Sequence, residues 1–185
     1  MSDAAERSPG GPLDRSAGAP DPVAETERWI EEFVLGLDLC PFAAGPWARE
    51  AVRVRAVRVD SVEAAVAELL HEATVLAEDG AETSLLVLAG PLAAGFDAFL
   101  DLLALAEEVF DTQGPGATIQ LVGFHPQYVF GDAPIDDPAH ATNRSPHPTI
   151  HLLRRADVAR AVAGHPDIAG IPRRNQALLR APAAR

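Results

Sequence analysis

The chain has 185 residues with a net charge of −12, and its mean hydropathy of +0.04 is that of an ordinary globular protein. No apolar run approaches the roughly 20 residues that a membrane-spanning helix needs, so we expect a soluble, cytoplasmic protein with no membrane partner. The acidic balance repels phosphate backbones, so we expect no nucleic-acid partner either.

Two residue types narrow the chemistry. All 15 basic residues are arginine, which excludes a lysine Schiff base and the lysine of a P-loop. Cys40 is the one cysteine, so neither an intramolecular disulfide nor a cysteine-only zinc site can form.

The N-terminal part of the chain changes character near residue 22. Residues 1–21 are rich in Pro, Gly, Ser and Asp and predict a disordered tail, whereas 22–181 predict a single α/β domain. Apolar residues at helical spacing predict a helix over 23–37, and the looser alternation over 52–58 predicts a strand.

The middle of the chain alternates between the two kinds of element. The patterns predict a helix over 61–78, a buried strand over 84–89, a helix over 96–110 and a strand over 118–124. This order indicates one layered domain, with a mixed or parallel sheet of three to four strands flanked by helices.

The C-terminal part is less regular. The short run 149–153 fits either a strand or a helical turn. Asp157 is a candidate N-cap for a helix that ends at Ala163, and a last helix is expected after Ile171-Pro172.

The polar segment 124–155 is the one credible functional site. A stretch of about 25 residues without periodicity is uncommon in a compact domain and is usually functional or disordered. Its aromatic side chains and five prolines argue against disorder. His125 follows a strand directly, where open α/β sheets place their ligand crevices. If 149–153 packs on the sheet, His125 and His151 should come within a few ångströms of each other.

Two chemistries suit these side chains. His125 and His151 with Asp136 or Asp137 form a two-histidine, one-carboxylate set for a divalent metal. Alternatively, a histidine oriented by Asp136 or Asp137 serves as a general base without metal. In both cases the donors for a substrate carboxylate or phosphate are Asn143, Arg144 and Ser145.

Structural roles account for the same residue types. Polar side chains in turns often brace their own backbone, and Arg144 pairing with an aspartate would hold the shape of the loop. The arginines of 53–58 are interpreted as a solvated edge or face, with an anion site as the alternative. Cys40 lies in apolar sequence and is interpreted as structural, with a nucleophile or metal ligand as the alternative.

Four motifs together are similar to those of a known family. They are WIEEFVLGLDLCPFA at 29–43, QLVGFHPQYVF at 120–130, DDPAHATNRSPHPTIHLLR at 136–154 and IPRRN at 171–175. They resemble a bacterial family catalogued as domain of unknown function 1415, over about residues 23–180. The resemblance brings no activity.

The resemblance does imply site positions. His140 stands where the family usually has asparagine and His147 where it has tyrosine, which leaves His125 and His151 as the central pair. The positions that match the family pattern are Cys40, Pro41, Phe42, His125, Pro126, Tyr128, Asp137, Asn143, Arg144, Ser145, Pro146, His151, Arg154 and Asn175.

The leading hypothesis is therefore an enzyme that acts on a small polar or anionic metabolite. The alternative is a non-catalytic module that binds a ligand or protein through the same loop; a pocket around the histidines would favour the enzyme. The catalytic candidates are His125, His151, Asp137 and Cys40. The substrate-binding candidates are Asn143, Arg144, Ser145, Tyr128 and Arg154. The metal ligands, if a divalent metal is the cofactor, are His125, His151 and Asp136.

Overall fold

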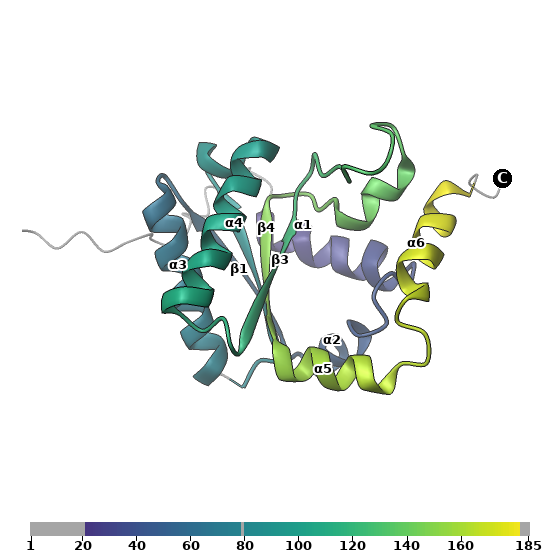
Figure 1. Ribbon diagram of the computed structural model, residues 1–185, viewed down its shortest axis with the longest axis horizontal. Coiled ribbons are helices and arrows are strands. Elements are labelled where there is room, and N and C mark those ends of the chain that lie inside the picture. Colours follow the sequence, from purple (N-terminus) through teal and green to yellow (C-terminus); the bar gives the residue numbers. More distant parts are fainter. Residues whose placement is uncertain (1–20, 79, 182–185) are drawn as a thin grey trace, which may run out of the picture.

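The computed structural model describes residues 21–78 and 80–181, and helices flank both faces of a central sheet (Figure 1). The α/β architecture expected from the sequence is confirmed. The tail expected over residues 1–21 lies, apart from Asp21, outside the described residues. None of the helices in the described ranges is both long and apolar enough to cross a membrane.

The sheet is mixed and has four strands in the order β1-β2-β4-β3. β1 and β2 are parallel, whereas β4 runs antiparallel between β2 and β3. The run after residue 148 is therefore a strand and not a helical turn. The strands are β1 (Val52–Arg58), β2 (Thr83–Ala89), β3 (Ile119–Phe124) and β4 (Thr149–Arg154).

One face of the sheet carries α3 (Val62–Glu78) and α4 (Phe96–Gln113), which connect the parallel strands in turn (Figure 1). Right-handed crossovers place successive helices on one side when the strands advance in one direction. Gly123 lets α4 approach β3 closely. A Cβ there would lie 2.8 Å from Cδ2 of Leu103 and 2.9 Å from Cε1 of Phe99. This layer holds the main hydrophobic core.

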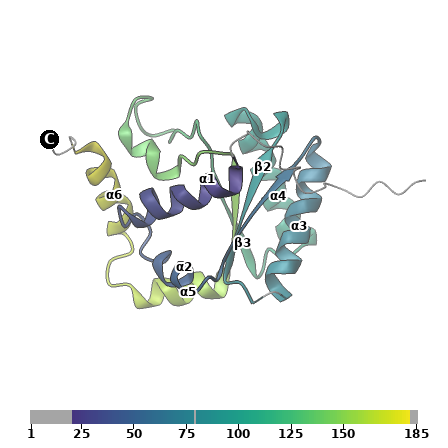
Figure 2. The same ribbon diagram turned by 180° about the vertical axis from the view of Figure 1, so that it is seen from behind.

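The remaining helices lie on the opposite face, where α1 crosses behind the sheet (Figures 1 and 2). They leave a second layer that is more open than the α3/α4 layer. Its elements are α1 (Pro22–Trp29), the π-helical η1 (Ile30–Leu35), α2 (Ala44–Ala48), α5 (Arg155–Gly164) and α6 (Gly170–Arg180). Two 3-10 turns complete the fold, η2 (Pro91–Ala93) and η3 (Pro138–Asn143).

Some element boundaries differ from expectation. The helix expected over 23–37 changes to π-helical hydrogen bonding at Ile30, and α2 has no periodic signal because it spans little more than one turn. The prediction of Asp157 as an N-cap was wrong. Arg154 occupies the N-cap of α5, and Asp157 lies in its first turn, where a carboxylate favours the helix dipole.

A buried ionic cluster joins β1 to α3. The carboxylate of Glu72 is fully buried and lies 2.8 Å from Nε of Arg53 and 2.9 Å from Nε of Arg55. The hydroxyl of Ser84 donates to it at 2.6 Å, and Arg55 also reaches Glu68 at 2.6 Å. The interpretation of the strand arginines as a solvated edge or face was therefore wrong for Arg53 and Arg55, because a helix with two inward carboxylates covers them, whereas Arg58 is exposed and pairs with Asp60.

Removing the central carboxylate should be costly. We expect Glu72→Ala to lower the free energy of unfolding by about 3 kcal/mol, since two guanidinium groups and a hydroxyl lose their common partner. Urea denaturation measures the change, with His71→Ala, an exposed neighbour on the same helix, as the matched control. Equal stability of the two variants would contradict this account of the cluster.

Candidate functional site

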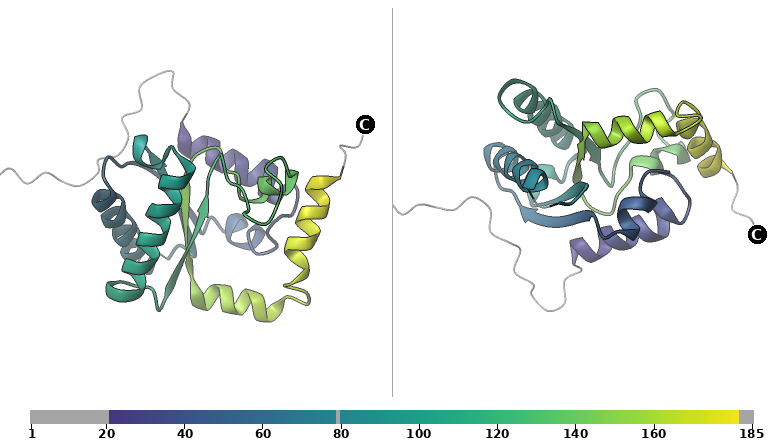
Figure 3. Two further views of the ribbon diagram at one scale, coloured as in Figure 1. Left: turned by 45° about the horizontal axis from the view of Figure 1, so that its top comes forward. Right: turned by 90° about the horizontal axis from the view of Figure 1, so that it is seen from below.

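A cavity of about 710 Å³ lies between the sheet and the helices of the more open layer. Seen from below, α1 and α5 lie on opposite sides of this layer, with α6 at the end away from the sheet (Figure 3). The strand side chains Leu85, Val122 and His151 form its floor. These three are register partners, so they point to the same face of adjacent strands.

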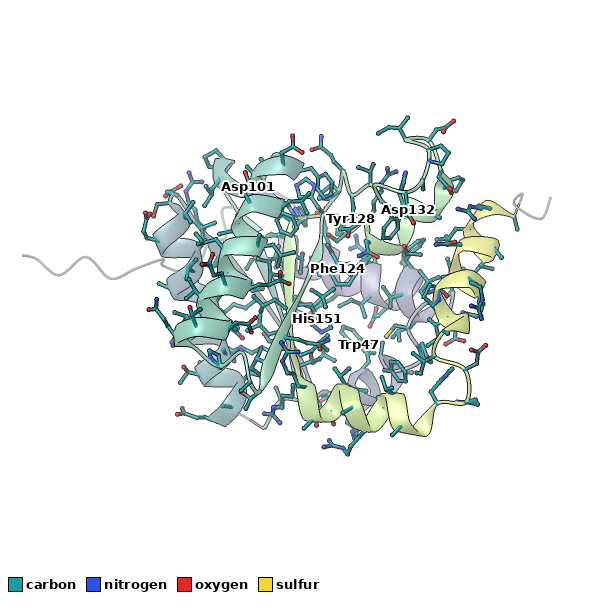
Figure 4. The ribbon with its side chains drawn as sticks, in the orientation of Figure 1. Trp47, Asp101, Phe124, Tyr128, Asp132 and His151 are labelled. Carbon is teal, nitrogen blue, oxygen red and sulfur yellow. The ribbon has the colours of Figure 1, made fainter. Side chains whose placement is uncertain are left out.

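Aromatic side chains form much of the wall. Trp29, Phe42, Trp47 and Phe124 come from four separate segments and all line the cavity. The Trp29 and Phe124 rings meet edge to face, with centroids 5.4 Å apart. Figure 4 shows Phe124 and His151 on the side of the sheet where Trp47 lies. Because the chain has two tryptophans in all, both of its indoles report on this cavity.

His151 is held in one tautomer by its neighbours. Its Nε2 lies 2.5 Å from Oγ1 of Thr83, and the same hydroxyl donates to the carbonyl oxygen of Leu152 at 2.8 Å. A hydroxyl has one proton, and a carbonyl can only accept. Both contacts are satisfied when Nε2–H donates to Thr83, which leaves the lone pair on Nδ1. Nδ1 has no hydrogen-bond partner among the described residues.

Burial lowers the pKa of His151 to about 4. The imidazole is therefore neutral at pH 7. A neutral ring with Nε2 already used presents a hydrogen-bond acceptor to whatever occupies the cavity.

His125 lies on the other face of the sheet. Phe124 points into the cavity, and successive side chains of a strand alternate, so the next residue turns toward α4. Nε2 of His125 donates to the carbonyl oxygen of Ala93 at 3.1 Å, while Nδ1 accepts from the amide of Gln127 at 3.1 Å. The ring packs at 5.1 Å from that of Phe99. With both nitrogens used and its pKa lowered by burial, this histidine joins the strand end to η2.

The structure thus does not bring His125 and His151 together. The strand over 149–154 does pack on the sheet as expected, but the alternation of side chains sends the two rings to opposite faces. Asp136 is exposed in the loop, so the proposed metal set is not assembled either. Among the residues that the structure describes, no group of three or more His, Cys, Asp or Glu side chains could hold a metal ion.

The other two histidines of the segment are structural ties. Nδ1 of His140 accepts from the amide of Phe130 at 3.1 Å, and its Nε2 contacts the carbonyl oxygen of Pro134 at 2.7 Å. His147 reaches across to α1, where its Nε2 lies 2.6 Å from the Glu25 carboxylate. Both therefore hold the loop in place.

Asp137 orients no histidine. Its carboxylate accepts from the amide of Ala139 at 2.9 Å, as the cap of η3, and pairs with Arg180 of α6 at 2.6 Å. The hydrogen bonds from Arg180 lower the pKa of Asp137 to about 2. The pair fastens the loop to the C-terminal helix, which packs against η3.

Three of the expected substrate-binding side chains are engaged elsewhere. Nε of Arg144 donates to the carbonyl oxygen of Tyr128 at 2.9 Å, and the Ser145 hydroxyl donates to the carbonyl oxygen of His147 at 2.5 Å. Arg154 lies at the cavity edge but donates to the carbonyl oxygen of Leu76 at the end of α3. All three side chains therefore brace the main chain, which is the structural role given above as the alternative for this loop.

Cys40 does line the cavity, half-buried in the turn between η1 and α2. Burial raises the pKa of its thiol more than the hydrogen bonds from the Phe42 and Ala43 amides lower it. The thiol is therefore protonated at neutral pH and is not activated as a nucleophile. Asn175 fixes this turn, because its amide donates to the carbonyl oxygen of Leu39 at 2.7 Å.

Several polar groups on the side chains that line the cavity are without a hydrogen bond among the described residues. They include the buried indole N–H of Trp29, the amide of Asn143, a candidate from the sequence, and the amide of Gln120, which sequence reasoning missed. It also missed Thr83 and the two tryptophans. Gln120, Val122 and Phe124 are alternate residues of β3, so the sequence could have placed all three on one face of the strand. It could not have shown which face of the sheet borders a cavity.

A second cavity of about 710 Å³ lies between α3 and the start of β3, beside residues such as Leu70, Pro115 and Ile119. It contains no His or Cys side chain. Its arginines, Arg154 and Arg155, donate to main-chain carbonyls. The cavity around His151 is therefore the candidate site.

Comparison with known proteins adds the family. A family model described as a protein of unknown function, DUF1415, matches residues 21–184. The chain belongs to this family. Neither the curated proteins nor the solved structures gave a match. The family thus covers the cavity and the loop that braces it, and it assigns neither of them a role.

The two central histidines should differ in their effect on stability. His125→Ala should lower the free energy of unfolding by about 2–4 kcal/mol, because it leaves a buried carbonyl and amide unpaired and opens a void. His151→Ala should cost about 1 kcal/mol, the hydrogen bond to Thr83. Urea denaturation of both variants measures this. A more stable His125 variant than His151 variant would contradict the assignment.

Neutral His151 should also make stability depend on pH. A histidine whose pKa falls from 6.5 to about 4 on folding contributes stability above pH 6.5 that is lost as the pH drops toward 4, since the unfolded chain takes up the proton first. Thermal melts from pH 7 to 4 should therefore show a steeper fall for the wild type than for His151→Gln. His71→Gln, which changes an exposed histidine, should keep the wild-type slope.

Proposed function

We propose that this protein is an enzyme that acts on a small molecule bound in the cavity at His151. One observation carries the proposal: a neutral imidazole with a fixed tautomer and a free ring nitrogen lies on the floor of an aromatic-walled cavity. Small-molecule sites commonly combine apolar walls with a few placed polar groups, in cavities of about 300–1,000 Å³.

The proposed chemistry depends on Nδ1 of His151, which either accepts a proton from the substrate or polarises a substrate O–H or N–H bond by accepting its hydrogen bond. The ring accepts a proton from the substrate while Thr83 keeps it oriented, and Asn143 offers a second polar contact. Because the pKa of His151 is about 4, it is ready as an acceptor at neutral pH but is a weak base. It therefore suits a substrate that presents an O–H or N–H group to the ring, such as a phenol, rather than one that must lose a proton from carbon.

This proposal changes the sequence-based hypothesis in two respects. The site moves from the loop itself to the cavity behind it, with His151 and Asn143 retained. The substrate is no longer expected to be anionic, because Arg144 and Arg154 bind main-chain carbonyls. The bacterial origin and cytoplasmic location inferred from the sequence remain part of the proposal. The lone Cys40 is compatible with a reducing compartment.

A binding module without catalysis is the second candidate, and one observation favours it. The protonated thiol of Cys40 and the low pKa of His151 mean that neither group is strongly activated in the free protein. Turnover therefore has to be measured beside binding.

Filling the cavity should abolish binding. Ala161 of α5 lines the cavity, whereas Ala159 on the same helix is exposed and does not. N-phenyl-1-naphthylamine, a neutral probe that fluoresces in apolar sites, should bind the wild type and Ala159→Phe alike. Ala161→Phe should weaken its binding at least about tenfold, the equivalent of losing 1.4 kcal/mol. Energy transfer from Trp29 and Trp47 measures occupancy.

A turnover assay with the wild type and a His151→Phe variant distinguishes an enzyme from a binding module. A metabolite mixture incubated with wild type and followed by mass spectrometry should lose a compound that His151→Phe leaves unchanged. Binding without any turnover would favour the binding module. Equal probe binding to the Ala161 and Ala159 variants would overturn the cavity as the site.

A further inference from the structure

We infer that the cavity takes an uncharged, planar aromatic molecule that donates a hydrogen bond, through N–H or O–H, to Nδ1 of His151. This inference deepens the proposed function, on which it rests, by naming the class of ligand. Three features of the cavity lead to it: the lone pair on its floor, the pairing of its charges and the composition of its walls.

The floor requires a donor. Thr83 is buried and its single proton goes to the carbonyl oxygen of Leu152, so the tautomer of His151 does not depend on the ligand. Nδ1 makes no hydrogen bond with the described residues, and it is not one of their fully buried polar atoms. Because His151 lines the cavity, this nitrogen opens into it. A ligand that brings only an acceptor would face a lone pair and lose a hydrogen bond.

Most of the charged groups of the cavity are paired with each other. Arg49 forms a bidentate pair with Glu82, with Nε and Nη2 at 3.0 and 2.7 Å from Oε1. Arg160 pairs with Asp157 on α5. Arg154 keeps its charge, but its Nη2 already donates to the carbonyl oxygen of Leu76. A cationic ligand would therefore leave water for a site whose carboxylates are both paired, and an anionic ligand would have to compete for Arg154, so a neutral ligand loses least on desolvation.

The walls favour a flat ring. Trp29, Trp47, Phe42 and Phe124 line the cavity from α1, α2, the Cys40 turn and β3. Aromatic pairs gain from offset or edge-to-face contact beyond their burial, and Trp29 and Phe124 already meet at 65°. Phe42 is held by an edge contact with His165 at 5.7 Å, so this wall is fixed before the ligand arrives.

Phenol and anisole test the hydrogen bond, because both carry an oxygen on the same ring and a methyl group replaces the donated proton in anisole. In ¹⁵N-labelled protein the indole N–H signals of Trp29 and Trp47 follow binding at one known place. We expect phenol to bind about fivefold more tightly than anisole, the value of one hydrogen bond. In His151→Phe the two should bind within about twofold of each other. Equal affinities in the wild type would overturn the donor requirement, and this comparison holds even if the variant fails to fold.

Benzoate and benzylamine test the charge. Both should shift the indole signals less than phenol at the same concentration. If either charged probe binds more tightly than phenol, the inference of an uncharged ligand fails while the cavity remains the site. If none of the four probes moves either indole signal, the proposed function fails with it.

Discussion

The antiparallel insertion of β4 between β2 and β3 is the constraint on which the rest of the structure depends. β4 hydrogen-bonds on both edges and joins two parallel strands that would otherwise lie apart. Its alternating side chains then serve two layers at once: Ile150 and Leu152 enter the core under α3 and α4, whereas His151 faces the cavity. A shift of one residue in register would bury the imidazole in the core and expose the aliphatic pair.

The two layers differ in how they are held. The α3/α4 layer holds the main hydrophobic core and an ionic cluster around Glu72, and Gly123 shows how closely α4 approaches β3. The opposite layer surrounds a cavity, so its helices are fastened by separate polar ties. These ties are His147 to Glu25, Asp137 to Arg180 and Asn175 to Leu39. The polar loop is rich in histidine, aspartate and arginine, the residue types also common in active sites, because it must hold these walls around a space that no side chain fills.

The chemistry available at the site depends on which polar side chains are not already used in structural hydrogen bonds. His125 and His140 have both ring nitrogens engaged, and Arg144 is bound to a carbonyl. His151 keeps one nitrogen free in an apolar, aromatic setting. We expect such a site to distinguish ligands by shape and by the position of one proton rather than by charge. For this reason we propose an uncharged substrate, where the loop composition had suggested an anionic one.

The sequence by itself determined the α/β class, the strands and the longer helices through residue 124 to within a few residues, and the family, and it named His151 as a site candidate. These are local properties, set by the period of apolar residues and by motifs along the chain. Tertiary structure alone decided that His125 is a tie, that Asp137 caps and pairs, and that Trp29 and Trp47 share a cavity with Cys40. The reason is geometric: the face on which a side chain ends depends on strand order and alternation, and an aromatic residue in a helix has the same periodic signature whether it packs in a core or lines a cavity.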